Sequence, residues 1–411
     1  MPSEWSIARL GDLTHRITKG TTPTTAGGQF TDSGVTFIKV ESIGDSGNLN
    51  LQRLSFIDEQ THELLARSKL QAEDILFTIA GTIGRVALVP SSILPANTNQ
   101  AVAIIRANRK MVNPFFLYYA LRDEQRVQHA RARVVQSVQA NFSLSELSSI
   151  QIPLPPMSVQ EAIAEILRTL DDKIELNRRM SETLEEVVRE LYNSWFSPEG
   201  CVSNPAFVTE PYSTWRPGTL GDLAAEKRQV VKPESMDSDT PYIGLEHMPR
   251  RRTTLDAWGS AEGLGSNKYQ FERSDILFGK LRPYFHKVGV APVNGVCSTD
   301  IVVVQPIDEN YFGFLLGLLS SDEFVRFTDS SSTGTRMPRT SWKTMSSFEV
   351  RVPPLSVART FDEFVRPIVA RTINATFENK TLSQLRDTLL PKLLSGELRV
   401  PDAEQLVSEA V

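Results

Sequence analysis

The side chains that could perform catalysis are few and scattered along this chain. Two aspartates recur, Asp74 and Asp275, each opening the segment "DILF" at an offset of 275 − 74 = 201. Paired carboxylates can serve a nuclease, but each of these begins a predicted strand, where an aspartate is better suited to cap a turn. The five histidines are dispersed, with no HExxH motif and no His/Cys cluster: His15, His62, His129, His247 and His286. The sequence therefore supports no metal site.

No cofactor-binding loop is recognisable either. The glycines of "AGTIGR" (Ala80 to Arg85) lie inside a predicted hairpin and do not open a helix, as a dinucleotide-binding loop requires. The chain contains no P-loop motif for ATP hydrolysis and no arguable Ser-His-Asp arrangement. Asn113-Pro114-Phe115-Phe116 resembles the Asn-Pro-Pro-Phe loop of amino-methyltransferases but lacks its second proline, so Asn113 is predicted to cap a helix. We expect a protein that is not itself an enzyme.

Composition sets the broad class of the protein. With 40% apolar residues in 411, the chain can form real cores, and it has no run of about eighteen apolar residues that could span a membrane. Two cysteines without a CxxC motif, and a start without a secretory signal, predict a cytoplasmic protein. The net charge of −5 argues weakly against nucleic acid. Local clusters of Lys and Arg matter more, because binding depends on local potential.

The elements that must position any site occur twice. "WSIARLGD" from Trp5 and "WRPGTLGD" from Trp215 share Trp, Leu, Gly and Asp at an offset of 215 − 5 = 210. "PPMSV" from Pro155 and "PPLSV" from Pro353 repeat at 353 − 155 = 198. With the "DILF" pair, three anchors recur in one order. Two such modules form a pseudo-dimer, which suits a ligand with two similar halves, such as duplex DNA.

The residue patterns of the two copies predict the same succession of strands and helices. In the first copy we expect a strand at Thr36–Val40, a hairpin at Asp74–Pro90, a strand at Ala101–Arg106, a helix at Pro114–Leu121, a polar stretch at Val134–Leu147 and a strand at Ser149–Leu154. In the second copy the counterparts are Pro241–Leu245, Asp275–Pro292, Ile301–Gln305, Tyr311–Phe327, Ser330–Trp342 and Ser347–Val352. In each copy a Pro-Pro pair then ends the predicted strand, and a long helix follows.

The two long helices should begin at Ser158, with Glu161 completing a capping box, and at Ser356, with Arg359 making a weaker cap. The first predicted seam is Ile163, Ile166, Leu170, Lys173, Asn177, Met180, Leu184, Val187 and Leu191. The second is Phe361, Phe364, Ile368, Arg371, Ala375, Glu378, Leu382, Leu385 and Leu389, with Pro367 expected to kink it or delay its start. These mainly apolar seams with polar interruptions are typical of an antiparallel coiled coil. The alternative is that each helix covers its own sheet.

The predicted fold class is α+β: two tandem β-rich domains joined by two long antiparallel coiled-coil helices with pseudo-two-fold symmetry. We place the first domain at residues 1–157, its spacer helix at 158–196, the linker and second domain at 197–355, the second spacer helix at 356–396 and a flexible tail at 397–411.

Several segments resemble the DNA-specificity subunit of type I restriction-modification enzymes. They are Glu4 to Leu13, Asp74 to Arg85, Ile152 to Gln160, Asp275 to Val288, Val352 to Arg359 and Leu385 to Leu398. Members of that family often have Glu-Gln after the Pro-Pro turn. Here Gln160-Glu161 reverses the pair and Ala358-Arg359 replaces it, which weakens the second cap but not the resemblance.

The resemblance implies a non-catalytic reader of double-stranded DNA, with one target-recognition domain for each half of a bipartite, asymmetric site. It also implies docking of two methyltransferase subunits, which carry S-adenosylmethionine, and of restriction (motor-nuclease) subunits, which use ATP and Mg²⁺. A helix from Ser158 to Trp195 is about 55 Å long at about 1.5 Å per residue, roughly one and a half turns of DNA. Two short half-sites with an unread gap are therefore expected.

The candidate DNA-binding residues are polar side chains of hairpin turns and loops at matching places in both copies. In the first copy they are Lys19, Lys39, Thr78, Thr82, Arg85, Asn99, Gln100, Gln136, Ser137, Gln139 and Asn141. In the second copy they are Lys280, Arg282, Tyr284, Lys287, Ser298, Asp300, Ser332, Thr333, Arg336 and Arg339. Two rival functions stay open: a stand-alone DNA methyltransferase, and a duplicated β-rich scaffold for protein or carbohydrate ligands.

One substitution tests this set. Arg336→Ala is expected to weaken binding at one half-site only, because a base contact serves one sequence. Binding titrations on duplexes altered in either half-site measure this. An equal loss on every sequence would make Arg336 a phosphate contact, and no loss would remove it from the set.

Overall fold

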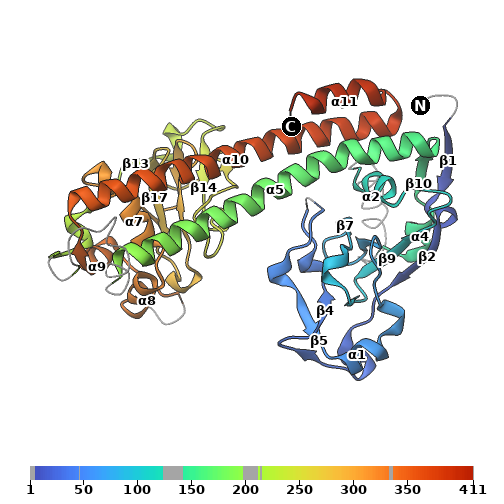
Figure 1. Cartoon of the computed structure of the whole chain (residues 1–411), viewed down its shortest axis with the longest axis horizontal. Coiled ribbons are helices and arrows are strands. Elements are labelled where there is room, and N and C mark those ends of the chain that lie inside the picture. The colour runs from blue at the N-terminus through green and yellow to red at the C-terminus, as the bar shows by residue number, and fades with distance from the viewer. Residues whose placement is uncertain are drawn as a thin grey trace. The chain divides into compact units, whose positions relative to one another are not determined.

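The computed structural model describes residues 5–45, 47–123, 142–197, 212, 215–332 and 337–410. The chain divides into two compact units (Figure 1). The first unit consists of Met1–Lys173 and Leu382–Val411, and the second of Ile174–Thr381. Two long helices run from one unit into the other, α5 (Met157–Phe196) and α10 (Leu355–Ser395).

The first unit opens with short strands and ends with a helical tail. Its described strands are β1 Ser6–Arg9, β2 Thr14–Lys19, β3 Phe30–Thr31, β4 Val35–Ile38, β5 Ser55–Ile57, β6 Ile75–Thr78, β7 Val86–Leu88, β8 Ala96–Thr98, β9 Val102–Ala107 and β10 Gln151–Leu154. Its shorter described helices are α1 Glu59–Leu64, α2 Pro114–Arg122, α4 Leu144–Ser148 and α11 Val400–Ser408.

The second unit repeats this order of elements. Its described strands are β11 Arg216–Thr219, β12 Ala224–Glu226, β13 Val230–Val231, β14 Pro241–Ile243, β15 Gly259–Ser260, β16 Lys268–Phe271, β17 Ile276–Gly279, β18 Val288–Val290, β19 Gly295–Cys297, β20 Ile301–Pro306 and β21 Glu349–Val352. Its shorter described helices are α7 Phe312–Leu319, α8 Asp322–Ser330 and α9 Trp342–Ser346.

The two units share the topology of the sheet that contains the hairpin. The order β2-β9-β6-β7 in the first corresponds to β12-β20-β17-β18 in the second, and every pair in these sheets is antiparallel. The predicted hairpins, β6·β7 and β17·β18, are confirmed. A second sheet in each unit contains one parallel pair, β4·β8 or β14·β19. The repeated anchors therefore accompany the same hairpin sheet in both units, whereas the second sheets differ: β3-β5-β4-β8 in the first unit and β13-β16-β19-β14-β15 in the second.

An antiparallel strand pair closes each unit beside its long helix. β1 pairs with β10, Ser6 opposite Leu154, and β11 pairs with β21, Arg216 opposite Val352. The chain then turns in the same way in both units, because Leu10 N donates to Ile150 O at 2.8 Å and Leu220 N donates to Phe348 O at 2.9 Å. The repeated glycine of "LGD" fits this packing, since a Cβ on Gly11 would lie 2.2 Å from Ser148 Oγ.

The repeated aspartates cap turns, as their position predicts. Asp74 accepts a hydrogen bond from Gln71 N at 2.8 Å, and Asp275 accepts one from Glu272 N at 2.7 Å. Asp74 is only 1% exposed, and its carboxylate accepts hydrogen bonds from Nε and Nη2 of Arg106, each at 2.7 Å. The carboxylates thus fix the start of each hairpin. Asn113 is likewise a cap, accepting from Phe115 N and Phe116 N at 2.9 and 3.1 Å.

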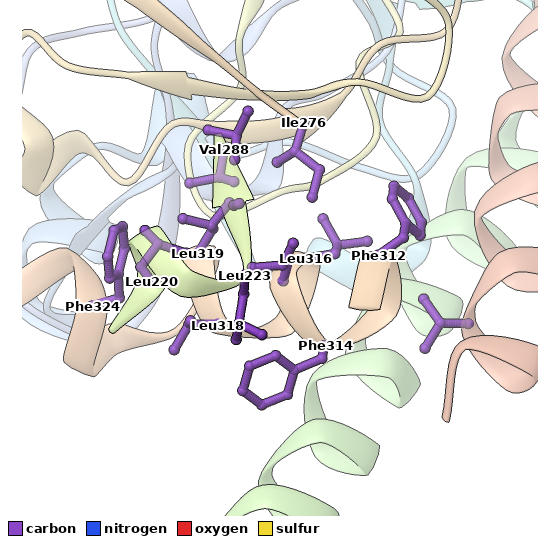
Figure 2. Packing of buried hydrophobic residues seen from close by; sticks show 14 of the residues in the cluster. Leu220, Leu223, Ile276, Val288, Phe312, Phe314, Leu316, Leu318, Leu319 and Phe324 are labelled. Atoms are coloured by element: carbon purple, nitrogen blue, oxygen red, sulfur yellow. The ribbon is translucent and has the colours of Figure 1, made fainter. Parts of the chain in front are cut away.

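A large apolar core forms in the second unit around α7 (Figure 2). Leu316 and Leu319 of this helix are buried with Ile276 and Val288 from the hairpin sheet and with Leu223. All eight residues of α7 are buried, which explains its continuous apolar sequence. The same core includes aromatic side chains of α5 and α10, and burial of so many large rings stabilises the unit.

The long helices pair in antiparallel fashion within the second unit. Asn177 Nδ2 donates to Asn379 Oδ1 at 3.0 Å, while the rings of Trp195 and Phe361 lie 5.4 Å apart, so residue numbers rise along one helix as they fall along the other. The predicted seam is wrong in part. Val187 is 41% exposed and Phe364 is 46% exposed, whereas Val188, Thr372 and Thr376 are buried. A few seam positions shift because the aromatic core fixes the rotation of each helix.

Four further expectations about helices are wrong. The segment Tyr311–Phe327 forms two helices, because α7 ends at Leu319 and Ser321 caps the start of α8 by accepting from Phe324 N at 3.1 Å. The helix α5 begins at Met157, so Ser158 lies inside its first turn and forms no capping box with Glu161. Of the two effects expected of Pro367, the delayed start is wrong, because α10 starts at Leu355, and the kink stays a prediction. Pro367 and Glu363, whose carbonyl loses its helical partner, are both exposed to water.

The fourth concerns the predicted flexible tail. The chain turns at Gly396, with φ 71°, and forms α11 (Figure 1). Ala403 and Val407 are buried, and their spacing by four places them on one face of this helix. Pro401 in the first turn and the ion pair between Arg399 and Asp402, at 3.0 Å, support its start.

Removing the capping carboxylate tests its role in the fold. Asp74→Ala is expected to destabilise the first unit by about 3 kcal/mol, because it leaves the Gln71 amide and the partly buried Arg106 without their partner. Hydrogen exchange of amides in β6 and β9 measures the loss. Glu63→Ala removes an exposed ion pair of the same unit and is the matched control, expected to change exchange little. Equal effects of the two substitutions would contradict the proposed role of Asp74.

Candidate nucleic-acid interface

Three polar segments meet at the far end of the hairpin in the second unit. Lys280 N donates to Asp300 O at 2.9 Å, which joins the hairpin to the turn before β20. Thr340 N donates to Lys280 O at 3.0 Å, and Arg282 N donates to Pro338 O at 2.8 Å. The polar stretch after α8 therefore returns to the hairpin, and all three segments present side chains from one place.

The first unit is joined by equivalent hydrogen bonds. Ile79 N donates to Ala101 O at 2.8 Å, and Phe142 N donates to Ile79 O at 2.9 Å. Ile79 corresponds to Lys280 (280 − 79 = 201) and Phe142 to Thr340 (340 − 142 = 198). These offsets match those of the nearby sequence anchors. Each unit thus has a hairpin turn, a turn before the next strand and a returning segment that converge.

Basic side chains surround an aromatic ring at this place in the second unit. Arg250 lies 3.9 Å from the centroid of the Phe285 ring, Arg282 lies 5.8 Å away and Lys287 Nζ lies 6.0 Å away. Lys287 Nζ also donates to Leu245 O at 2.5 Å, and burial lowers the pKa of this lysine. Tyr284 beside them is 50% exposed. Cations and aromatic rings are the groups that contact phosphates and stack on bases.

The charge of this cluster is only partly neutralised. Arg339 pairs with Asp300 at 3.2 Å, and Arg251 pairs with Asp322 at 3.0 Å. By contrast, Lys280, Arg250 and Arg282 have no carboxylate partner among the residues that the structure describes. A local excess of positive charge therefore exists on a chain whose net charge is negative.

A shallow cavity of about 450 Å³ adjoins this cluster in the second unit. It is lined by Arg251, Tyr284, Asp322, Val325, Arg326 and Asp329. The lining residues carry charges of both signs. They include no nucleophile with an adjacent base. His286 lies next to it, with Nε2 donating to Ser320 O at 2.8 Å and Nδ1 3.5 Å from Asp322.

The predicted residues of the first unit have varied surroundings. Arg85 is held by Asp45 through two bonds, of 2.6 and 2.9 Å, and also donates to Ile43 O. Lys39 Nζ lies 4.3 Å from the Phe30 ring centroid, while Lys19 is exposed at the end of β2. Asn99 accepts from Ala101 N at 3.1 Å, and the exposed Gln100 hydrogen-bonds Thr22.

Thr78 is the clearest misassignment among these candidates. Its side chain is fully buried, and its hydroxyl donates to Thr82 O at 2.5 Å and accepts from Arg85 N at 2.8 Å. It therefore holds the hairpin turn and is not available to a ligand in this conformation. Thr82 itself is exposed at the tip.

The remaining candidates of the second unit also act within the loops. Ser298 Oγ accepts from Asp300 N at 3.2 Å, and Ser332 Oγ donates to Asp329 O at 2.7 Å. Six candidates lie outside the described residues: Gln136, Ser137, Gln139, Asn141, Thr333 and Arg336. Phe285 and Arg250 were not predicted. The alternation of basic and aromatic residues in "KLRPYFHK" and the basic run Arg250–Arg252 were the signals that point to them.

The described residues lack the features of two other classes of protein. No described helix combines the length and apolar character needed to cross a bilayer. In the same part of the chain, no three His, Cys, Asp or Glu side chains are grouped so as to hold a metal ion.

Comparison with known proteins places the chain among DNA-specificity proteins. The family described as "Type I restriction modification DNA specificity domain" matches residues 2–186 and 212–379. The Type I restriction enzyme MjaIX specificity subunit of Methanocaldococcus jannaschii is 23% identical over 421 residues, covering 98% of this chain and 95% of that protein. The HindI specificity subunit of Haemophilus influenzae is 22% identical over 468 residues, covering 96% and 100%. The crystal structure of a type I S subunit from M. genitalium has the same fold, with a TM-score of 0.58 at 18% identity, covering 95% of this chain and 96% of that one.

The environment of His286 predicts a pH dependence of the second unit. Burial, aided by Arg251, lowers the pKa of His286 below its ordinary 6.5. The unfolded chain then binds more protons than the folded one, so stability should fall as pH drops below about 6.5 until the lower folded pKa is passed. His286→Asn is expected to flatten this fall. Urea unfolding followed by tryptophan fluorescence reports on the second unit, which contains four of the five tryptophans, Trp195, Trp215, Trp258 and Trp342.

The control for this measurement is His15→Asn, which changes an exposed histidine of the first unit. It should leave the slope unchanged. A slope that is the same in wild type and His286→Asn would show that His286 does not titrate in this range.

Proposed function

The chain belongs to the type I restriction modification DNA specificity family, and on that basis we propose that it is the non-catalytic subunit that selects the DNA site of such a complex. The observation that carries this proposal is the convergence of the same three polar segments in both units. Each unit then reads one half of a bipartite site. Because the loop side chains differ between the units, the two half-sites differ in sequence.

The reading surface in this proposal is built from backbone-fixed loops on a rigid sheet. The hairpin, the turn before the next strand and the returning segment hold one another by main-chain hydrogen bonds, such as those of Lys280 and Thr340. Rigid backbone lets side chains discriminate base edges, because little entropy is lost when they bind. The uncompensated charge of Lys280, Arg250 and Arg282 supports binding to phosphates and bases.

The partners follow from the same assignment. The proposed complex contains two methyltransferase subunits, which bind S-adenosylmethionine and methylate an adenine flipped from the duplex. Restriction subunits, which use ATP and Mg²⁺, complete a cleaving complex. The paired helices α5 and α10 are the proposed spacer and docking element between the half-sites.

The two rival functions make different demands on the chain. A scaffold for protein or carbohydrate ligands would explain the duplication and the acidic net charge, but not the cations gathered around Phe285. A stand-alone methyltransferase needs a cofactor loop, and the glycines Gly81 and Gly84 lie in a hairpin turn instead. Methyl transfer by the purified chain without partners would establish that rival.

The proposed function is tested by co-expressing the chain with the methyltransferase subunits and mapping modified adenines. A bipartite motif with a fixed gap is expected. For the assembled complex, the logarithm of the DNA-binding constant should fall linearly with the logarithm of the salt concentration. The expected slope is about −0.9 for each phosphate contacted. Complexes lacking this chain are the control and should modify no such motif. Affinity that does not respond to salt, or modification without a bipartite motif, would overturn the proposal.

A further inference from the structure

The hairpin turns of the two units each have a residue in the left-handed conformation at either end, although the turn of the second unit is one residue longer. In the second unit, Arg282 and His286, each with φ 52°, flank the turn Pro283–Phe285. In the first unit, Gly81 has φ 74° and Gly84 has φ 91°. The strand registers Phe77 to Val86 and Phe278 to Val288 align them, since 282 − 81 = 201 and 286 − 84 = 202.

Glycine adopts this left-handed conformation without strain, whereas residues with a Cβ do so only at a cost. The first unit therefore shows that the turn does not need a side chain at either position. The strain in the second unit must be offset by what the two side chains do. For His286 the reason is visible, because its buried ring donates to Ser320 O at 2.8 Å and packs beside α8.

Arg282 has no such explanation. Its guanidinium makes no hydrogen bond or ion pair with any residue that the structure describes, and its closest aromatic neighbour is the Phe285 ring at 5.8 Å. Its backbone, by contrast, is tightly held, since its N–H donates to Pro338 O and its carbonyl accepts from Phe285 N at 2.9 Å. The backbone of Arg282 is thus strained and fixed, while the N–H groups of its guanidinium have no acceptor among the described residues.

We propose that Arg282 is a specificity-determining residue of the second unit and that it reads a guanine through the O6 and N7 atoms of that base. This inference rests on the proposed function. A phosphate contact would not require a fixed backbone, and Lys280 and Arg250 already supply positive charge in the same cluster. A paired guanidinium fork is the group that matches the major-groove edge of guanine. The first unit, with Gly81 at this position, lacks the contact.

The test uses the assembled complex with its methyltransferase subunits and duplexes that carry the mapped motif. Replacing single guanines by 7-deazaguanine removes the N7 acceptor and leaves Watson–Crick pairing intact. Wild type is expected to lose about tenfold in affinity at one guanine of one half-site. Arg282→Gly should bind the unmodified duplex about tenfold or more weakly and should not respond to the modified guanine, because it has no donor for N7. Arg282→Lys should bind more weakly than wild type, because lysine keeps the charge but not the planar fork.

A second readout separates this role from a structural one. Arg282→Gly should raise the melting temperature of the second unit by about 1–4 °C while it lowers affinity, since glycine relieves the strain. Ser274→Gly is the matched control: Ser274, with φ 77°, is also left-handed, is exposed, and lies at the other end of β17. It should raise the melting temperature without changing affinity.

Wild-type affinity in both Arg282 variants, or a full response to 7-deazaguanine in Arg282→Gly, would overturn the assignment of Arg282. A wild-type complex that binds no DNA would overturn the proposed function, and the assignment with it.

Discussion

The antiparallel pairing of β1 with β10, and of β11 with β21, is the constraint on which the rest of each unit depends. Each pair joins segments more than a hundred residues apart, so it closes a long loop whose entropy the packing beneath must offset. The repeated glycine and the Pro-Pro stop serve this junction, because Gly11 leaves room for Ser148 and Pro155 and Pro156 end the strand before α5 begins. The position of the long helix relative to its own sheet therefore follows from strand register.

Each hairpin combines a fixed end with a variable one. At the fixed end a buried aspartate caps the turn, and its second partner differs: Arg106 binds Asp74, whereas Gln305 and Lys227 contact Asp275. At the variable end one unit has glycines and the other has strained Arg282 and His286. The aspartate cap is thus common to both hairpins, while the residues proposed to read DNA at the other end can differ between the units.

Polar groups are buried along the paired helices, where apolar residues would pack more simply. Within the second unit, Asn177 meets Asn379, and Glu185 accepts from Thr253 N and Thr254 N at 3.3 and 3.0 Å. Within the first unit, Asp171 receives Arg122 at 2.9 Å and Arg386 at 2.6 Å. Such pairs contribute little net stability, but a slip of the helices would leave them unsatisfied. They therefore favour one register, and a proposed spacer between half-sites needs one defined length.

The sequence by itself determined the duplication, the hairpins, the capping roles of Asp74 and Asn113 and the antiparallel helices, because turn residues, apolar periodicity and repeated anchors are local signals. It could not determine which seam residues are buried or that Thr78 is buried, since these depend on packing between distant segments. The break at Ser321 and the helical tail do carry local signals, the Ser321 cap and Pro401 in the first turn, although the expectations above did not follow them. The sequence also could not show the cations gathered around Phe285 or the strain at Arg282. Both features depend on three loops that are distant in the chain and converge at the end of one hairpin. Only the tertiary structure determines that convergence, because it is made by main-chain hydrogen bonds between these loops.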